Sequence, residues 1–253
     1  MSIGLFDKLA VNHRLLLSLP FREGSGVITH DVARPHHLLT QNDPGIGVFT
    51  WENIASGCPY LDFFRGGGGA TEGVYLDCPA ADTVDLDFTT DDYSVVCWVN
   101  HRATGHFNPQ ILVGRYGVDL DGWEVYLESD TGIGVDYLEH RHHHSSLGAG
   151  NLRDGCFSVG WTPASGWSLL GISRSGLYPQ HYRNGLPLEM TYGDDGMRDP
   201  DTCNRDLVIG ARFTKDQDWL DAGIWGMRLW DRELSKEENR FIWNREKHWF
   251  GVN

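Results

Sequence analysis

Short stretches rich in Val, Ile, Tyr and Trp recur along almost the whole chain, and Gly, Asp, Asn and Pro separate them. Side chains that are aromatic or branched at Cβ suit the pleated surface of a sheet, whereas the separating residues suit turns. This spacing is typical of an all-β sandwich or barrel. The expected strands are Leu15–Phe21, Gly73–Leu76, Tyr93–Asn100, Gln110–Arg115, Trp123–Glu128, Ile133–Leu138, Cys156–Trp161, Trp167–Ser173, Gln180–Arg183, Asp206–Ala211 and Gly223–Trp230.

Two of these stretches indicate how the strands are buried. In Trp123–Glu128, apolar side chains at every second position alternate with Glu124 and Glu128, so one face of this strand is expected to point inward. Tyr93–Val99 is apolar at consecutive positions, as in a strand that is covered on both faces. Together the two patterns predict stacked antiparallel sheets, which is the arrangement of a jelly-roll β-sandwich.

One segment near the C-terminus has the pattern of a helix. Ser235–Glu238 matches a capping box, in which the Ser hydroxyl and the Glu carboxylate accept hydrogen bonds from free backbone N–H groups. Phe241 and Ile242 follow at helical spacing. We therefore expect one short C-terminal helix on a single sandwich domain over residues 14–253, preceded by an N-terminal arm at residues 1–13. A sandwich of roughly 250 residues is routinely one domain.

The charge of the chain excludes one large class of partner. Its formal net charge is −14, and no cluster of Lys or Arg offsets it, so a nucleic acid would be repelled. No apolar run approaches the roughly 18 residues that a membrane span needs, so no membrane insertion is expected. The first residues do not resemble a signal peptide, which predicts synthesis in a host cytoplasm without export. The five cysteines are widely spaced, so reduced thiols are the expected state.

Several motifs in the expected order carry a resemblance to a known fold family. An apolar strand is followed by a Gly-Ser-Gly turn, a central strand contains Trp-Val, two paired strands end in Ser-Gly and Asn-Gly, and a closing strand ends in Arg-Glu-Leu-Ser. This succession resembles the laminin G-like domains of the concanavalin A-like lectin and glucanase superfamily. The segments concerned are Leu17–Gly26, Phe88–Val99, Trp167–Gly176, Tyr182–Gly185, Leu207–Ala211 and Met227–Ser235.

The resemblance implies two curved sheets with a concave face and loop rims where family members bind sugars or proteins. It also implies where a structural calcium ion would lie, near the first turn and before the last strand. Here Asp31 is followed by Val32-Ala33-Arg34, and Trp225-Gly226 stands where a pair of Asp residues is usual. The usual calcium ligands are therefore not matched, and no cofactor is expected, because calcium needs six to eight oxygen ligands.

Asp119, Asp121 and Trp123 form the first candidate site. Carboxylates that accept hydrogen bonds from hydroxyls, next to an aromatic ring that stacks on a sugar, are typical of carbohydrate sites. The alternative is a hairpin turn at Asp121-Gly122 with Trp123 in the core.

The tract His140–His144 is the second candidate site. In an extended chain, His140, His142 and His144 would share one face and could bind a transition metal. The alternative is an exposed polar loop or strand, because no carboxylate or cysteine falls at a matching spacing.

The aromatic tail is the third candidate site. Trp243, Trp249 and Phe250 either pack on the sandwich or form an interface with another subunit, since exposed aromatic residues are common at interfaces.

Three functions fit these observations. The main hypothesis is a non-enzymatic structural, decoration or adhesion protein of a large assembly, most plausibly a bacteriophage virion, with other virion subunits as partners in an oligomer. The alternative is a lectin-like module that binds host glycans. The third is a glycoside hydrolase, which needs two carboxyl groups about 5–10 Å apart. Glu124 and Glu128 share a strand face but lie roughly 13 Å apart along it, so an enzyme is not expected.

Overall fold

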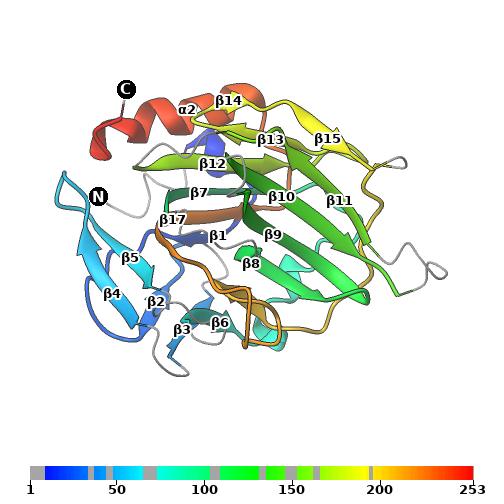
Figure 1. The fold of residues 1–253 in the computed structure, drawn as a ribbon, viewed down its shortest axis with the longest axis horizontal. Coiled ribbons are helices and arrows are strands. Elements are labelled where there is room, and N and C mark those ends of the chain that lie inside the picture. Colours follow the sequence, from blue (N-terminus) through cyan, green and yellow to red (C-terminus); the bar gives the residue numbers. More distant parts are fainter. Residues whose placement is uncertain are drawn as a thin grey trace.

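The computed structural model describes residues 9–33, 37–43, 48–64, 73–102, 109–130, 135–145, 153–161, 166–193 and 196–252. In this part of the chain, two antiparallel sheets of eight and nine strands pack face to face, with a single α-helix near the C-terminus. In Figure 1 the strands β8 to β11 form one layer and β7, β12 and β17 form the other. The predicted all-β, jelly-roll-like sandwich with one C-terminal helix is confirmed.

The first sheet, called sheet A, follows the order β14-β13-β12-β7-β17-β5-β4, and β1 pairs with β17 beside β5. Its strands are β1 (Leu15–Leu19), β4 (Val48–Asn53), β5 (Pro59–Phe64), β7 (Ser94–His101), β12 (Ser168–Ser173), β13 (Gln180–Arg183), β14 (Leu186–Pro187) and β17 (Ala222–Trp230). The central strands β7 and β17 are buried over most of their length, as the continuous apolar pattern predicts.

The second sheet, called sheet B, follows the order β15-β11-β10-β9-β8-β16-β6-β3-β2. Its strands are β2 (Ile28–His30), β3 (Leu38–Asn42), β6 (Tyr75–Cys78), β8 (Gln110–Gly117), β9 (Asp121–Asp130), β10 (Val135–His143), β11 (Arg153–Ser158), β15 (Met190–Tyr192) and β16 (Leu207–Ile209). The predicted strand Ile133–Leu138 begins outside the described residues.

The main hydrophobic core lies between the two sheets. On β9, Trp123, Val125 and Leu127 belong to this core, and the intervening Glu124 does not. The predicted alternation therefore sets the inward face of β9, because successive side chains of a strand point to opposite sides. On the other side of this core, β7 contributes Val95 and Cys97, and β17 contributes residues that include Ile224.

A second apolar cluster covers the outer face of sheet A. The helix α2 (Lys236–Glu246) begins at Ser235, whose hydroxyl accepts from the backbone N–H of Glu238 while the Glu238 carboxylate accepts from the backbone N–H of Ser235. The predicted capping box is therefore present. Ile242 on α2 packs with Trp98 and Trp230, which point outward from sheet A. The sandwich thus carries a third layer over part of one sheet.

The hairpin between β13 and β14 has the turn that its sequence predicts. Asn184 and Gly185 both have positive φ, 54° and 73°, as a two-residue type I′ turn requires. A Cβ atom on Gly185 would lie 2.9 Å from the Cα of Arg240 and from the Cβ of Trp243. The glycine therefore serves both the turn and the close approach of α2.

The described part of the expected N-terminal arm packs on the sandwich. The 3-10 helix η1 (Ala10–Asn12) places Val11 in the second apolar cluster, and the indole N–H of Trp230 donates to the backbone carbonyl of Val11 at 2.8 Å. Residues 1–8 lie outside the described residues. No helix among the described residues is both long and apolar enough to span a bilayer.

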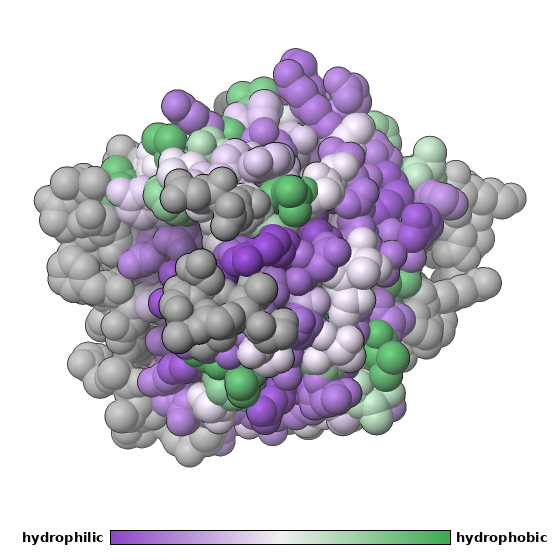
Figure 2. Space-filling view, turned by 90° about the vertical axis from the view of Figure 1, so that its right-hand side faces the viewer, coloured by the Kyte–Doolittle hydropathy of each residue, from purple (hydrophilic) through white to green (hydrophobic). Residues whose placement is uncertain are grey.

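The surface at one end of the sandwich is mainly polar. Figure 2 shows the right-hand side of the view in Figure 1, where hydrophilic residues predominate and hydrophobic ones form small separate groups. This side therefore offers no broad apolar area among the residues that are coloured.

Candidate functional site

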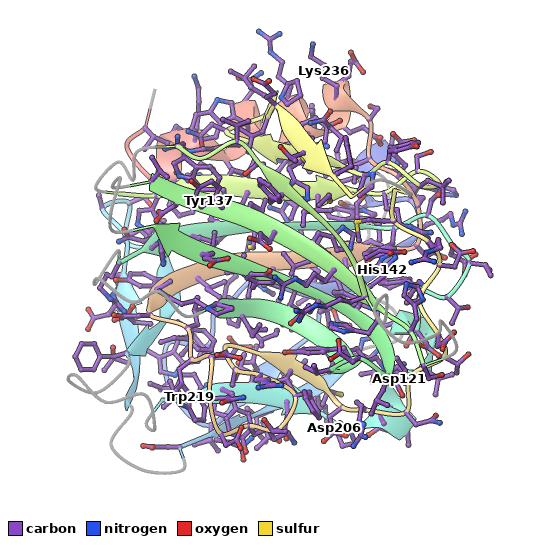
Figure 3. All side chains as sticks on the ribbon, turned by 45° about the vertical axis from the view of Figure 1, so that its right-hand side comes forward. Asp121, Tyr137, His142, Asp206, Trp219 and Lys236 are labelled. Atoms are coloured by element: carbon purple, nitrogen blue, oxygen red, sulfur yellow. The ribbon has the colours of Figure 1, made fainter. Side chains whose placement is uncertain are left out.

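Asp119, Asp121 and Trp123 do not form a surface site together. The ring of Trp123 is fully buried between the sheets, and its indole N–H donates to the backbone carbonyl of Leu86 at 2.9 Å. Asp119 lies in the turn before β9 with a positive φ of 56°. Because Trp123 points into the core, it offers no ring face for a sugar, and the arrangement is that of the hairpin alternative. Asp121, at the start of β9, is labelled in Figure 3.

The histidine tract divides between different surroundings. His140 and His142 point into the interior of the sandwich, whereas the ring of His143 stacks on Tyr116 at 5.0 Å. His144 lies outside the strand, with its Nε2 atom 3.3 Å from a carboxylate oxygen of Asp154. The expected common face therefore holds for His140 and His142 on β10, and His144 follows just beyond the end of the strand, beside the Asp154 that pairs with His142. All four rings are buried, so the alternative of an exposed loop is wrong as well.

A buried group that the sequence did not predict lies beside His140. His140, Cys156 and His181 each place one potential ligand atom within 4.8 Å of the others. Cys156 is directly opposite His140 on the neighbouring strand β11, while His181 comes from β13 in the other sheet. The pairing of β10 with β11 could have indicated Cys156, but nothing in the sequence indicates His181, because it approaches across the interior.

Burial keeps these histidines neutral. It lowers the pKa of both His142 and His181 to about 3, and the Arg174 guanidinium adds to the effect on His142. It also lowers the pKa of His140 well below the usual value, with His142 and His181 adding to the shift. Burial raises the pKa of the Cys156 thiol. A neutral imidazole has a free lone pair, which is the form that binds metals.

The acidic side chains of β9 do not form the pair that a glycosidase needs. The Glu124 carboxylate is buried, accepts from His143 Nε2 at 3.0 Å and lies 4.0 Å from Arg141 Nη1. Between Glu124 and Glu128, Tyr126 donates to Glu139 on β10. The carboxylate of Glu124 is thus already engaged within the sheet.

Asp31, which lies near the expected calcium position, is also engaged. Its carboxylate accepts from the backbone N–H groups of Ser18, Ala33 and His37, and its Oδ2 lies 2.9 Å from His37 Nδ1. Burial alone would lower the pKa of His37, but its hydrogen bonds to Asp31 and Asp85 raise it to about 9. The cation beside Asp31 is therefore an imidazolium.

The aromatic tail packs on its own sheet. Phe250 stacks on Trp98 at 3.9 Å between ring centroids, and Trp243 stacks on the same ring at 5.2 Å. Trp243 and Phe250 are 8% and 7% exposed, so neither presents its ring to a partner. Trp249 is half-buried and meets Trp225 edge to face at 5.4 Å. Of the three predicted interface residues, only Trp249 keeps a substantial exposed surface.

A pocket of about 420 Å³ lies where this tail meets the outer face of sheet A. It is built by η1, by the segment that runs from β1 to β2, by β17 and by α2. A bulge in β17, where the register shifts between Trp225 and Arg228, contains Gly226 at a positive φ of 65°. The residues that shape the site include Trp225, Arg228, Glu246, Trp249, Glu23 and Phe241.

The polar groups in this pocket fall into two kinds. Arg228 donates two hydrogen bonds of 2.8 Å to the Glu246 carboxylate, which also accepts from the indole N–H of Trp98 at 2.8 Å. By contrast, the indole N–H of Trp225 and the Oε2 atom of Glu23 are buried and have no hydrogen-bond partner among the described residues. Two residues of the pocket wall therefore each have one unmet polar atom, a donor on Trp225 and an acceptor on Glu23. Buried polar groups without partners are uncommon and costly.

Comparisons with known proteins show the fold and no closer relationship. No family model and no curated protein matches the chain, so the predicted laminin G-like family and phage origin are not confirmed. Similar solved structures include the binding domain of botulinum neurotoxin DC in complex with SialylT, with 10% identity and a TM-score of 0.65 over 93% of this chain. The binding domain of Paraclostridial Mosquitocidal Protein 1 has 11% identity and a TM-score of 0.65 over 96% of it.

A further similar structure concerns botulinum neurotoxin type C, whose cell entry depends upon interaction with two ganglioside molecules. It has 9% identity and a TM-score of 0.64 over 93% of this chain. The chain spans 52% to 56% of the length of these three structures. At such identities the likeness establishes the β-sandwich fold alone.

Proposed function

We propose that this chain is a non-catalytic carbohydrate-binding module and that the pocket between β17 and α2 is its binding site. The observation that carries the proposal is the pair of unmet polar atoms, the Trp225 indole N–H and Glu23 Oε2, in one aromatic pocket. A sugar hydroxyl both donates and accepts hydrogen bonds, so sugar hydroxyls match both atoms in kind. Both atoms are closed to solvent in this structure, so a sugar reaches them once the side chains that cover them turn aside. The exposed part of Trp249 supplies an apolar surface for a ring face.

The size and construction of the pocket fit a small polar ligand. Its volume of about 420 Å³ lies within the ~300–1,000 Å³ that is usual for small-molecule sites. One part of its wall is held in place by the two hydrogen bonds between Arg228 and Glu246 and by the Trp98 indole N–H that donates to Glu246. Preformed walls lower the entropic cost of binding.

The structural neighbours support this proposal over the virion role. One botulinum structure concerns interaction with ganglioside molecules and another is a complex with SialylT, so both concern glycan ligands. No comparison supports a virion subunit, and that role and its localisation stay predictions. A hydrolase is not proposed, because the Glu124 carboxylate is held by His143 and the neighbours are binding domains.

A glycan array with the full chain tests the proposal, followed by titration of any glycan that binds. Trp225→Phe keeps a ring but removes the indole N–H, and we expect its affinity to fall about threefold to tenfold. Glu23→Gln removes a charged acceptor, and we expect a loss of roughly tenfold or more. Tyr178→Phe and Glu52→Gln change matched groups on exposed side chains and should bind as the parent does.

Two results would refute this assignment. An array without any bound glycan would remove the proposed function. A glycan that binds with unchanged affinity in both pocket variants would keep the function but place its site elsewhere. A screen with glycoside substrates should show no turnover, and turnover that is lost in Glu124→Gln would instead indicate an enzyme.

A further inference from the structure

The polar cluster between the two sheets has the composition of a metal site. His140 and Cys156 come from neighbouring strands of sheet B, and His181 comes from β13 of sheet A. All three are at most 1% exposed. We propose that His140, Cys156 and His181 bind one thiophilic transition metal ion, Cu⁺ or Zn²⁺, in the interior of the sandwich. Mixed thiolate and imidazole ligands select these ions over calcium or magnesium.

A chain of hydrogen bonds fixes the proton on His140. The Nδ1 atom of His142 lies 2.6 Å from the backbone carbonyl of Arg198, so this nitrogen carries the proton and donates it. The Nε2 atom of His142 then accepts from the hydroxyl of Tyr93, at 2.9 Å. The Tyr93 oxygen in turn accepts from Nε2–H of His140. A neutral imidazole carries only one N–H group.

The consequence is an unprotonated Nδ1 atom on His140. This atom is buried and has no hydrogen-bond partner among the described residues. A buried lone pair without a donor is costly, and a metal ion satisfies it. The Tyr93 hydroxyl plays the part of the outer hydrogen-bond partner that orients most metal-binding histidines.

Cys156 and His181 complete the ligand set. The Sγ atom of Cys156 lies 3.5 Å from the Nε2 atom of His181, which is about the spacing of two ligand atoms on one zinc or copper ion. One imidazole nitrogen of each histidine and the Cys156 sulfur lie within 4.8 Å of one another, so closing around an ion requires movements on the order of 1 Å. On binding, the Cys156 thiol forms the metal–sulfur bond and releases its proton to solvent, because the thiolate is the ligand form.

The charge of the surroundings separates the two candidate ions. One thiolate and two neutral imidazoles neutralise Cu⁺ but leave one positive charge with Zn²⁺. All three ligands are at most 1% exposed, so solvent does not compensate that charge. The site is therefore expected to hold Cu⁺ more tightly than Zn²⁺, since uncompensated buried charge is costly.

Metal analysis of the full chain gives the direct test. Because the site is buried, the protein is unfolded, freed of metal with a chelator under reducing conditions, and refolded with Cu⁺, Zn²⁺ or Co²⁺ as a spectroscopic substitute. We expect one ion per chain, a rise in the melting temperature over the metal-free protein, and a cobalt–thiolate charge-transfer band. Wild-type protein that refolds but retains no ion and gains no stability with any of the three overturns the proposal.

Variants locate the ion. Cys156→Ser should abolish the charge-transfer band, whereas Cys58→Ser, at a half-buried cysteine outside the cluster, should keep it. Tyr93→Phe leaves the three ligands in place but removes the hydroxyl that orients His140, and we expect about a 10- to 100-fold weaker affinity. Full binding by folded Cys156→Ser would refute this site. If Cys156→Ser does not fold, the metal content of the wild-type protein and the metal affinity of Tyr93→Phe test the proposal instead.

Discussion

The same residue type meets opposite conditions in two buried regions of this sandwich. His37, near the edge strands β2 and β3, lies between the carboxylates of Asp31 and Asp85, and its pKa rises to about 9. His142 and His181, between the sheets, make no hydrogen bond to a carboxylate among the described residues, and burial lowers their pKa to about 3. Burial alone therefore does not set the charge of a histidine. The neighbouring carboxylates determine the charge state, because their attraction offsets the desolvation cost of the imidazolium.

The largest expected effect is a loss of unfolding free energy at acid pH, caused by protonation of the interior histidines. A folded pKa below the unfolded value means that the unfolded chain takes up protons first, so stability is complete above about pH 6.5 and is lost as the pH falls towards 3. For metal-free protein at pH 4, we expect a loss of about 3 kcal/mol from each of His142 and His181. Urea unfolding between pH 7 and pH 4 measures this loss of unfolding free energy.

Two variants test whether this acid loss belongs to the interior. His13→Gln changes an exposed histidine and should leave the pH dependence of the unfolding free energy unchanged. His142→Gln should reduce this loss without abolishing it, because His140 and His181 are also held neutral. A parent protein whose stability is flat between pH 6.5 and 4 would show that these histidines are not held neutral.

The second-largest expected effect is a loss of stability when the ion pair of His37 is broken. Asp31→Asn removes the buried carboxylate that accepts from His37 and from backbone N–H groups at 2.7 and 2.8 Å. Removing one partner of a buried pair commonly costs about 3–5 kcal/mol, so we expect about 4 kcal/mol by urea unfolding at pH 7. Asp82→Asn, at an exposed carboxylate, serves as the control and should change stability little.

An alkaline loss of stability is the third expectation. Because the folded pKa of His37 is raised, its contribution is complete below about pH 6.5 and is lost as the pH rises through 9. We expect a loss of about 3 kcal/mol over this range. His37→Gln should lack this loss. NMR titration of the imidazole gives the pKa directly, and a value near 6.5 would contradict the proposed ion pair.

The smallest expected effect is the loss of stability on removing Asp85, the more exposed of the two carboxylates beside His37. The Asp85 side chain is 32% exposed, so water screens its interaction with His37 Nε2. Asp85→Asn should therefore cost about 1 kcal/mol or less and leave the pKa of His37 above its usual value. An effect as large as that of Asp31→Asn would mean that both carboxylates act equally.

Local patterns predicted the elements whose sequence is strongly periodic. The alternation in Trp123–Glu128 and the capping box at Ser235 correspond to β9 and α2. The expected strands include β1 but not β2 to β5, β14 or β15. These six strands are either very short or carry mixed polar and apolar residues with weak periodicity. The turn at Asn184-Gly185 was predictable, since its two positive φ angles depend on these residues alone.

The candidate sites were less predictable. Trp225 attracted notice only as a departure from a calcium motif, and Glu23 only as part of a turn, yet both line the pocket. Their unmet polar atoms follow from the way α2 and the first strands meet over sheet A, which no spacing encodes. For Trp123 the sequence allowed a surface or a core position, and the packing of the two sheets placed it in the core.

The sequence by itself determined the layered β architecture, the helix cap and the inward face of β9, because these depend on side-chain alternation and on contacts within a few residues. Only the tertiary structure brought His181 to His140 and Cys156, and only it set His37 between two carboxylates. The physical reason is that proximity across a sandwich depends on how its layers stack. The charge state of a buried group then depends on that proximity. The order of residues along one strand determines neither the proximity nor the charge state.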